Sequence, residues 1–168
     1  VSKRADYTIA ASHYLCDFLR PFAKNLAYIP SVADTRKFCK NGQNRLRGPV
    51  VLSWIGTFFR PDDVENVKFL IDCFMQLQKA QDRKDVYLNI AGDGIYTDQI
   101  IAYIKAQSDE RIRYSGWIDP EKIPAYLETI DIGLFPLVSK TKFHLSKSPT
   151  KLFEYMASHR PIVVTDLP

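Results

Sequence analysis

Short apolar runs alternate with longer amphipathic stretches along most of the chain. The apolar runs, several of them rich in β-branched residues, predict five strands at 50–55, 86–91, 111–115, 131–135 and 162–164. The stretches between them repeat apolar residues at helical spacing and predict helices at 63–80, 99–107 and 119–129 and from Pro149 onwards. Strand–helix alternation with short connections is typical of an α/β fold, in which a parallel sheet carries helices on both faces. The continuous β-branched run at 162–164 predicts a strand that is covered on both faces.

The first 48 residues show a weaker pattern. Two short strands are predicted at 6–12 and 26–29, with a helix at 13–20 between them. Residues 31–48 are polar, basic and poorly periodic, which predicts a linker. Taken alone, this pattern also fits the β-α-β start of a single domain, so the residues themselves leave both interpretations open.

Candidate chemistry concentrates at the start of the last helix. Ser148 is a good N-cap residue, and Pro149 suits the first helical position, where a missing N–H costs nothing. Free backbone amides there, the positive end of the helix dipole and the charge of Lys151 predict a site for an anion, above all phosphate. Glu154, one turn later, can accept two hydroxyl hydrogen bonds. Phosphate donors one turn from a diol acceptor match a nucleoside diphosphate, although helix–strand units of other parallel sheets share parts of this pattern.

Other candidate segments come directly after the predicted strands, because open parallel sheets bind ligands at the carboxyl ends of their strands. These segments are Gly56-Thr57, Gly92-Asp93-Gly94, Gly116-Trp117 and 136–148. Glycine lets a ligand approach the backbone closely, but it is also common in tight turns of any such sheet. Asp93 is expected to cap the following helix. His144, in the predicted polar loop 139–147, is expected to be exposed.

Several of these motifs occur together in one known family. The string S-K-S-P-T-K-L-F-E-Y-M-A, which starts at Ser146, resembles the donor-nucleotide motif of retaining GT-B glycosyltransferases of family 4, or group 1. The strings I-G-T-F, I-A-G-D-G and Y-S-G-W resemble landmarks of the same family, in the same order. The resemblance implies a Rossmann-like domain, the C-terminal half of a GT-B fold, here truncated. It also implies retaining, hexosyltransferase-like sugar transfer from a nucleotide-diphosphate sugar to a glycan, lipid or other acceptor, as in polysaccharide biosynthesis.

The resemblance also implies roles for single residues, with Glu154 holding the ribose, Gly56 near the diphosphate and Gly116 near the base. The full set implied to bind the donor nucleotide and its phosphates is Gly56, Thr57, Arg60, Gly116, Ser148, Pro149, Thr150, Lys151 and Glu154. Arg60 is the one cation left in a loop where the family often has two phosphate clamps. No catalytic residue is assigned.

The chain departs from the family pattern at two positions. Ser146 stands where many members have a first glutamate. The family pattern implies a carboxylate contact with the donor sugar at that position, and this chain has no carboxylate there to make it. His159 stands where the family usually has glycine, so a positive φ is expected there, at a cost of roughly 1 kcal/mol.

The resemblance divides the chain into two parts. Residues 1–48 are implied to be the tail of an N-terminal domain plus a linker, and 49–168 a nucleotide-sugar-binding domain that is incomplete at its C-terminus. The acceptor site would lie in the missing N-terminal domain, so we expect this chain alone to bind a donor without transferring sugar. Two alternatives are a non-catalytic nucleotide-binding or assembly module that works with a partner chain, and a GT-B sugar-nucleotide epimerase.

Composition excludes several other classes. A hydrophobic share of 46% and a net charge of +4 describe a globular protein that suits anionic substrates or a transient, peripheral contact with an anionic membrane. The odd number of cysteines, the lack of C-x-x-C and the lack of a signal peptide or spanning segment lead us to expect a cytoplasmic protein. The sequence contains no D-x-D triplet that would indicate a metal site and no G-x-G-x-x-G that would indicate a dinucleotide site. It also contains no basic stripe with stacked aromatic residues that would indicate nucleic acid binding. We therefore expect neither metal nor cofactor.

Overall fold

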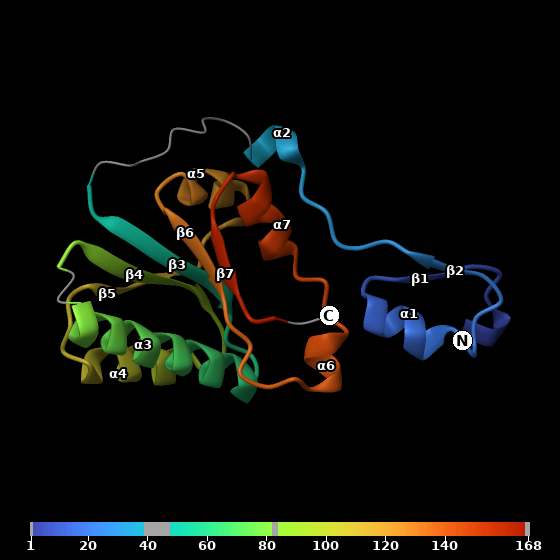
Figure 1. The fold of residues 1–168 in the computed structure, drawn as a ribbon, viewed down its shortest axis with the longest axis horizontal. Helices are drawn as coiled ribbons and strands as arrows, with labels where there is room; N and C mark the ends of the chain where they lie inside the picture. Colours follow the sequence, from blue (N-terminus) through green and yellow to red (C-terminus); the bar gives the residue numbers. More distant parts are fainter. Residues whose placement is uncertain (1, 39–47, 82–83, 167–168) are drawn as a thin grey trace.

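The structure, a computed structural model, describes residues 2–38, 48–81 and 84–166. Its centre is a sheet made of β3 (Val50–Thr57), β4 (Val86–Asp93), β5 (Ile112–Gly116), β6 (Ile132–Phe135) and β7 (Ile162–Val164). All neighbouring strands run parallel, in the order β5-β4-β3-β6-β7 (Figure 1). The predicted α/β architecture is confirmed, and the carboxyl ends of all five strands meet at one edge of the sheet.

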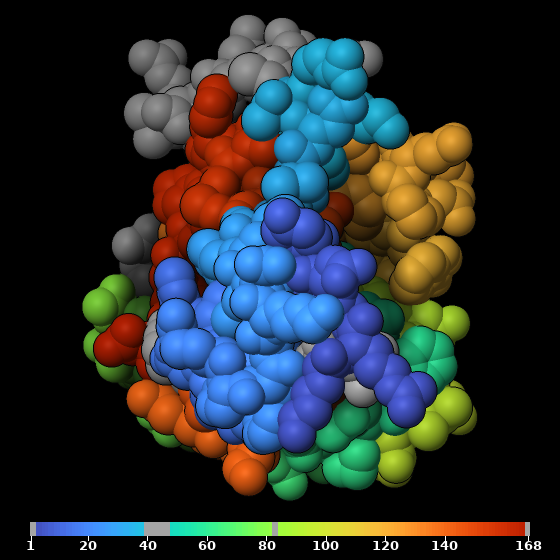
Figure 2. Space-filling view, turned by 90° about the vertical axis from the view of Figure 1, so that its right-hand side faces the viewer, coloured from blue at the N-terminus to red at the C-terminus, as the bar shows by residue number. Residues whose placement is uncertain are grey.

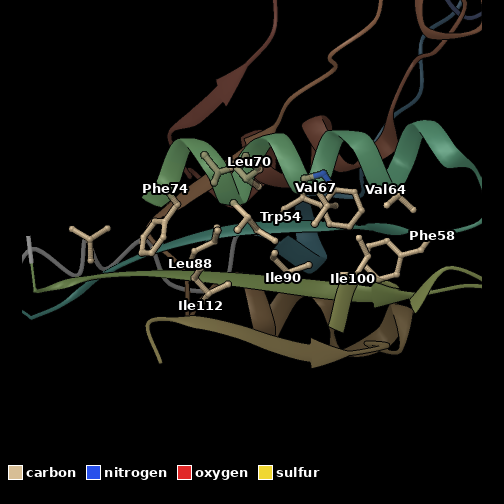
Figure 3. Packing of buried hydrophobic residues seen from close by; sticks show 13 residues of the cluster. Trp54, Phe58, Val64, Val67, Leu70, Phe74, Leu88, Ile90, Ile100 and Ile112 are labelled. Carbon is tan, nitrogen blue, oxygen red and sulfur yellow. The ribbon is translucent and has the colours of Figure 1, made fainter. Parts of the chain in front are cut away.

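Helices α3 (Pro61–Gln81) and α4 (Thr97–Ala106) cover one face of this sheet (Figure 1). Val67, Leu70 and Phe74 share one side of α3 because they are three or four residues apart. They point towards the strands and pack with Leu88 and Ile90 of β4, which are fully buried (Figure 3). Each such side chain stabilises the fold by about 1.5–3 kcal/mol when buried, so this layer is a main source of stability.

The opposite face is covered by η2 (Pro120–Lys122), α5 (Ile123–Leu127) and α7 (Thr150–Ala157). Alternation along β3 serves both layers, because Trp54 packs with the residues of α3 whereas Ile55 packs with those of α5 and α7. Leu127 and Tyr155 belong to this second core. Helices therefore lie on both faces of the sheet, as the sequence predicts.

Two elements differ from the prediction. Helix α6 (Lys142–Leu145) forms inside the segment 139–147 that is predicted to be a loop, and the hydroxyl of Thr141 caps it. Strand β7 is not covered on both faces, since Val163 and Val164 are 61% and 48% exposed. β7 pairs with β6 alone among the described strands and so forms an edge of the sheet. The prediction of a strand buried on both faces is wrong for this reason.

Residues 2–38 form a smaller structure beside the main sheet. It contains η1 (Ser2–Arg4), β1 (Thr8–Ala10), α1 (His13–Leu19), β2 (Leu26–Tyr28) and α2 (Thr35–Phe38). Strands β1 and β2 pair in parallel with each other and with no other strand of the described chain. Helix α2, in the segment predicted to be a linker, contacts α7, and Figure 2 shows this light-blue segment against the red C-terminal part. Residues 39–47 of the predicted linker lie outside the described residues.

Gly92 is the position where we expect an added side chain to cost most. Its φ is +146°, and a Cβ there would lie 2.0 Å from the carbonyl oxygen of Gly56 on β3. We expect Gly92→Ala to lower the free energy of unfolding by about 2–4 kcal/mol in urea titrations. Gly116→Ala is the matched control, because φ is +71° there but nothing lies within 4 Å of the new Cβ. It should lose only about 1 kcal/mol, and equal losses would contradict the steric explanation.

Candidate functional site

The start of α7 presents backbone donors to the carboxyl edge of the sheet. Pro149 is the N-cap, with extended backbone (φ −73°, ψ 115°) and no side-chain hydrogen bond. Among the described residues, none accepts a hydrogen bond from the backbone N–H of Thr150 or Lys151, whereas Leu152 N donates to Pro149 O at 3.1 Å. The prediction of free amides at this helix start is confirmed.

Ser148 does not act as the predicted cap. Its Oγ accepts a hydrogen bond from the backbone N–H of Ser31 at 2.8 Å, and its carbonyl oxygen accepts one from Ser31 Oγ at 2.5 Å. The hydroxyl and the carbonyl group of Ser148 therefore point to the segment between β2 and α2. The helix begins one residue later than predicted, at Thr150.

Tyr155 fixes the orientation of α7 on the sheet. Its side chain is 1% exposed, and its hydroxyl donates to Ser53 O on β3 at 3.3 Å. Gly133 of β6 makes room for the ring, because a Cβ there would lie 2.6 Å from it. Burial raises the pKa of Tyr155, so the phenol stays neutral. Lys151, four residues earlier, lies on the same side of the helix and is carried towards the sheet edge.

Two adjoining cavities open beside the α7 start, one of about 270 Å³ and one of about 190 Å³. Thr57, Thr150 and Lys151 line both of them. The predicted site residues that the cavities bring together are Gly56, Thr57, Pro149, Thr150, Lys151 and Glu154. They come from positions about 100 residues apart, on β3 and at the start of α7, which meet because β6 pairs with β3 and α7 packs on both.

The larger cavity contains two lysines. Lys147 and Lys151 line it together with Asp63 and Asn66 of α3. Burial lowers the pKa of Lys151, against the opposing influence of Glu154 and Asp63, and its Nζ lies 5.7 Å from the centroid of the Trp54 ring. Burial also lowers the pKa of Lys147. Two partly desolvated cations beside free amides make this cavity attractive to an anion.

The smaller cavity is more apolar and holds one carboxylate. Glu154 lines it, and burial raises its pKa while the charge of Lys151 opposes that rise. Trp117, Ile118 and Ile123 form apolar walls, and the Trp117 side chain is 56% exposed. A carboxylate beside an aromatic surface can accept hydrogen bonds from a polar ligand whose flat part stacks on the ring.

Three predicted site residues do not line these cavities. Ser148 is turned to Ser31, as described above, and Gly116 directly precedes Trp117 at the end of β5. Arg60 is exposed, and its guanidinium carbon lies 3.9 Å from the centroid of the Phe143 ring. The same ring lies 4.4 Å from Nζ of Lys147, so Phe143 contacts both cations.

Two residues that line the cavities, Lys147 and Trp117, lie in the predicted candidate segments 136–148 and Gly116-Trp117 but were not assigned to donor binding. Lys147 lies four positions before Lys151. Two lysines on either side of Ser148-Pro149 were the available signal for a second cation at this site. Trp117 follows the glycine that ends β5, and an aromatic residue in such a turn was the signal there.

Three further expectations concern single residues. His144 is only 2% exposed, so the prediction that it is an exposed loop residue is wrong. Its Nδ1 lies 2.7 Å from Ser139 O, which folds the segment around α6. Asp93 accepts hydrogen bonds from Gly94 N and Thr97 Oγ1 at 2.8 and 2.7 Å, so it supports the start of α4 although it is not the N-cap residue.

His159 has the expected positive φ, at +54°. Within the described parts of the chain, no group of three or more His, Cys, Asp or Glu residues could hold a metal ion. No helix of the described residues is long and apolar enough to cross a membrane.

A family model described as "Glycosyl transferases group 1" matches residues 49–168, which include both cavities. The chain belongs to this family. Among curated proteins, a glycosyltransferase of Bacillus subtilis (strain 168) named for teichuronic acid biosynthesis, TuaH, is 40% identical over 55 residues. That match covers 33% of this chain and 14% of the relative.

Solved glycosyltransferase structures share the fold. The S. aureus TarM structure aligns with 99% of this chain at a TM-score of 0.73 and 18% identity. The sucrose-phosphate synthase of Thermosynechococcus elongatus aligns with 99% of it at a TM-score of 0.71 and 18% identity. The chain covers 31% of TarM and 42% of the synthase, so it spans less than half of either structure. Its Rossmann-like sheet is that of GT-B glycosyltransferase domains.

The lowered pKa of Lys151 predicts how stability depends on pH. The unfolded chain holds this proton more tightly than the folded one, so between the folded-state pKa and about 10.4 stability rises with pH at this site. Lys151→Met removes the penalty, so we expect it to melt higher than the unsubstituted chain at about pH 7, by roughly 2–4 °C per kcal/mol relieved. The advantage should shrink towards about pH 10 in thermal unfolding.

Lys105→Met is the control for this prediction, because Lys105 is exposed near the end of α4. It should give no advantage that varies with pH. A Lys151→Met advantage of equal size at every pH would show that better packing, and not relief of a desolvated charge, is the cause.

Proposed function

We propose that this chain binds the nucleoside diphosphate part of a nucleotide-sugar donor at the α7 start, and that the longer protein transfers the sugar. The observation that carries the proposal is the pair of free amides at Thr150 and Lys151, which opens onto the lysine-lined cavity next to Glu154. Membership of the glycosyl transferase family supports the transfer.

The two cavities divide the donor between them. The diphosphate lies on the amides of Thr150 and Lys151, with the charges of Lys151 and Lys147 beside it. Glu154 accepts the ribose hydroxyls, and the base lies in the smaller cavity near Gly116 and Trp117. Gly56 and Thr57 contact the donor where the cavities join, and Arg60 supplies charge from the rim. The TarM structure contains UDP and the pneumococcal GtfA structure contains UDP and GlcNAc, which makes UDP the natural first probe.

The dipole of α7 and the two lysines would stabilise the diphosphate most strongly when its bond to the sugar breaks. Negative charge then grows on the departing diphosphate, and preorganised donors stabilise it without rearranging. We infer retaining, hexosyltransferase-like transfer to a glycan, lipid or other acceptor in polysaccharide biosynthesis, without a metal or cofactor. Residues 1–48 belong in this proposal to the preceding domain and its linker. The acceptor site lies in that domain, so this chain alone binds the donor without transfer.

Lys151→Ala tests the phosphate site. We expect titration calorimetry to show that UDP binds the unsubstituted chain more tightly than UMP does, and UMP more tightly than uridine. Lys151→Ala should weaken UDP binding by about 1.5–3 kcal/mol, because the lysine makes a charged contact, but leave uridine nearly unchanged. Added salt should narrow the gap between UDP and uridine. Lys105→Ala, far from the cavities, is the control. Equal affinity for UDP and uridine would overturn the proposed function.

Glu154→Ala tests the ribose contact. Loss of an acceptor for two hydroxyl groups should weaken binding of both UDP and uridine by about 1.5–3 kcal/mol. UDP with a 2′-deoxyribose should bind the unsubstituted chain less well, and the substitution should then cost it less. Glu128→Ala is the control, since Glu128 is exposed after α5. Unaltered affinity in Glu154→Ala would remove this residue from the site.

A further inference from the structure

Ser31 and Ser148 form a reciprocal pair across 117 positions of the sequence. The backbone N–H of Ser31 donates to Ser148 Oγ at 2.8 Å, and the hydroxyl of Ser31 donates to the carbonyl oxygen of Ser148 at 2.5 Å. Pro30 and Pro149 are the neighbours of the pair, and the fixed φ of each proline restricts the backbone next to each serine. The pair joins the segment after β2 directly to the start of α7.

These two hydrogen bonds determine what Ser148 cannot do. A serine directly before Pro149 can act as the helix N-cap, with its Oγ accepting from the backbone N–H of Thr150 or Lys151. Those are the two amides that the proposed diphosphate needs. Because Ser148 Oγ is turned to Ser31 instead, no described residue uses the amides. A capping serine and a bound phosphate would compete for the same donors.

The surroundings hold Ser31 in place for this role. Residues 30–35 follow the outer side of α7 and enclose with it a groove of about 460 Å³, lined on the helix side by Phe153, Met156 and Ala157. Helix α2 contacts α7 directly (Figure 2). Phe38 packs against the core that contains Tyr155. The position of Ser31 is thus set by the same helix whose start it controls.

We propose that Ser31 is a positioning residue of the donor site: it holds Ser148 away from the capping position and so keeps the amides of Thr150 and Lys151 available to the diphosphate. This assignment rests on the proposed nucleotide-sugar site. It links the segment carrying β1 and β2 to donor affinity, because any displacement that separates Ser31 from Ser148 frees the serine hydroxyl to occupy the amides.

The test compares UDP and uridine binding in a set of serine variants of the chain by titration calorimetry. Ser31→Ala removes the hydroxyl that holds the Ser148 carbonyl and keeps the backbone N–H that holds Ser148 Oγ. With one of the two hydrogen bonds gone, the backbone at Ser148 can rotate towards the capping position. We expect UDP affinity to fall roughly three- to tenfold, the range set by one N-cap hydrogen bond, while uridine affinity and the melting temperature stay nearly constant. Ser31→Thr keeps the hydroxyl and should bind UDP within about twofold of the unsubstituted chain.

The double variant Ser31→Ala/Ser148→Ala separates positioning from simple loss of structure. Without a hydroxyl at 148 nothing can compete for the amides, so UDP affinity should recover towards that of the unsubstituted chain. Ser158→Ala is the control at the other end of α7, where the buried Oγ has no partner among the described residues.

Each outcome decides one question. If the unsubstituted chain does not bind UDP, the proposed function fails and this inference with it. If it binds UDP but Ser31→Ala binds equally well, only the inference is overturned. A parallel loss of UDP and uridine binding with a lower melting temperature would make Ser31 merely structural. A double variant no better than Ser31→Ala would show that Ser148 does not compete.

Discussion

The packing of Tyr155 against Gly133 is the contact on which the candidate site depends. The ring lies where a strand residue with any side chain would exclude it, and the hydroxyl reaches across to β3. One residue thereby joins α7 to two neighbouring strands and fixes the rotation of the helix about its axis. With that rotation fixed, Lys151 faces the sheet edge one turn earlier, and Glu154 faces the smaller cavity. A glycine in a strand and a phenol in a helix thus determine where two charged groups lie at the edge of the sheet.

The site concentrates positive charge that the described protein balances only in part. Lys147 and Lys151 are both partly desolvated. The acids that oppose this effect, Asp62, Asp63 and Glu154, form no ion pair with the two lysines within the described residues. Aromatic rings take part of this role, since Phe143 lies beside Lys147 and Trp54 beside Lys151. Ring contacts stabilise a cation but do not neutralise it. The two lysines are therefore already partly desolvated in the folded protein before an anion binds.

The sequence predicted the features that follow from local chemistry. β-Branched runs marked the strands, and Pro149 and Lys151 marked a helix start with free amides. His159 marked the positive φ after that helix. What it missed depends on partners far along the chain. Ser148 looked like a cap because its partner, Ser31, is 117 positions away. His144 looked like a loop residue because its burial depends on α6 and on Asp62 of α3, whose carboxylate lies 3.6 Å from its Nε2. The exposure of β7 could not be anticipated either, because a buried strand and an edge strand can have the same apolar composition.

The parallel pairing of β3 with β6 also has a kinetic consequence. Leu52 lies opposite Ile132, so β3 and β6 meet only after a loop of about 80 residues has closed. Closing such loops costs entropy before the contacts repay it, and chains dominated by distant contacts fold slowly. Each cavity is lined by residues from both sides of that closure. Binding at either cavity would therefore require β3 and β6 to have come together.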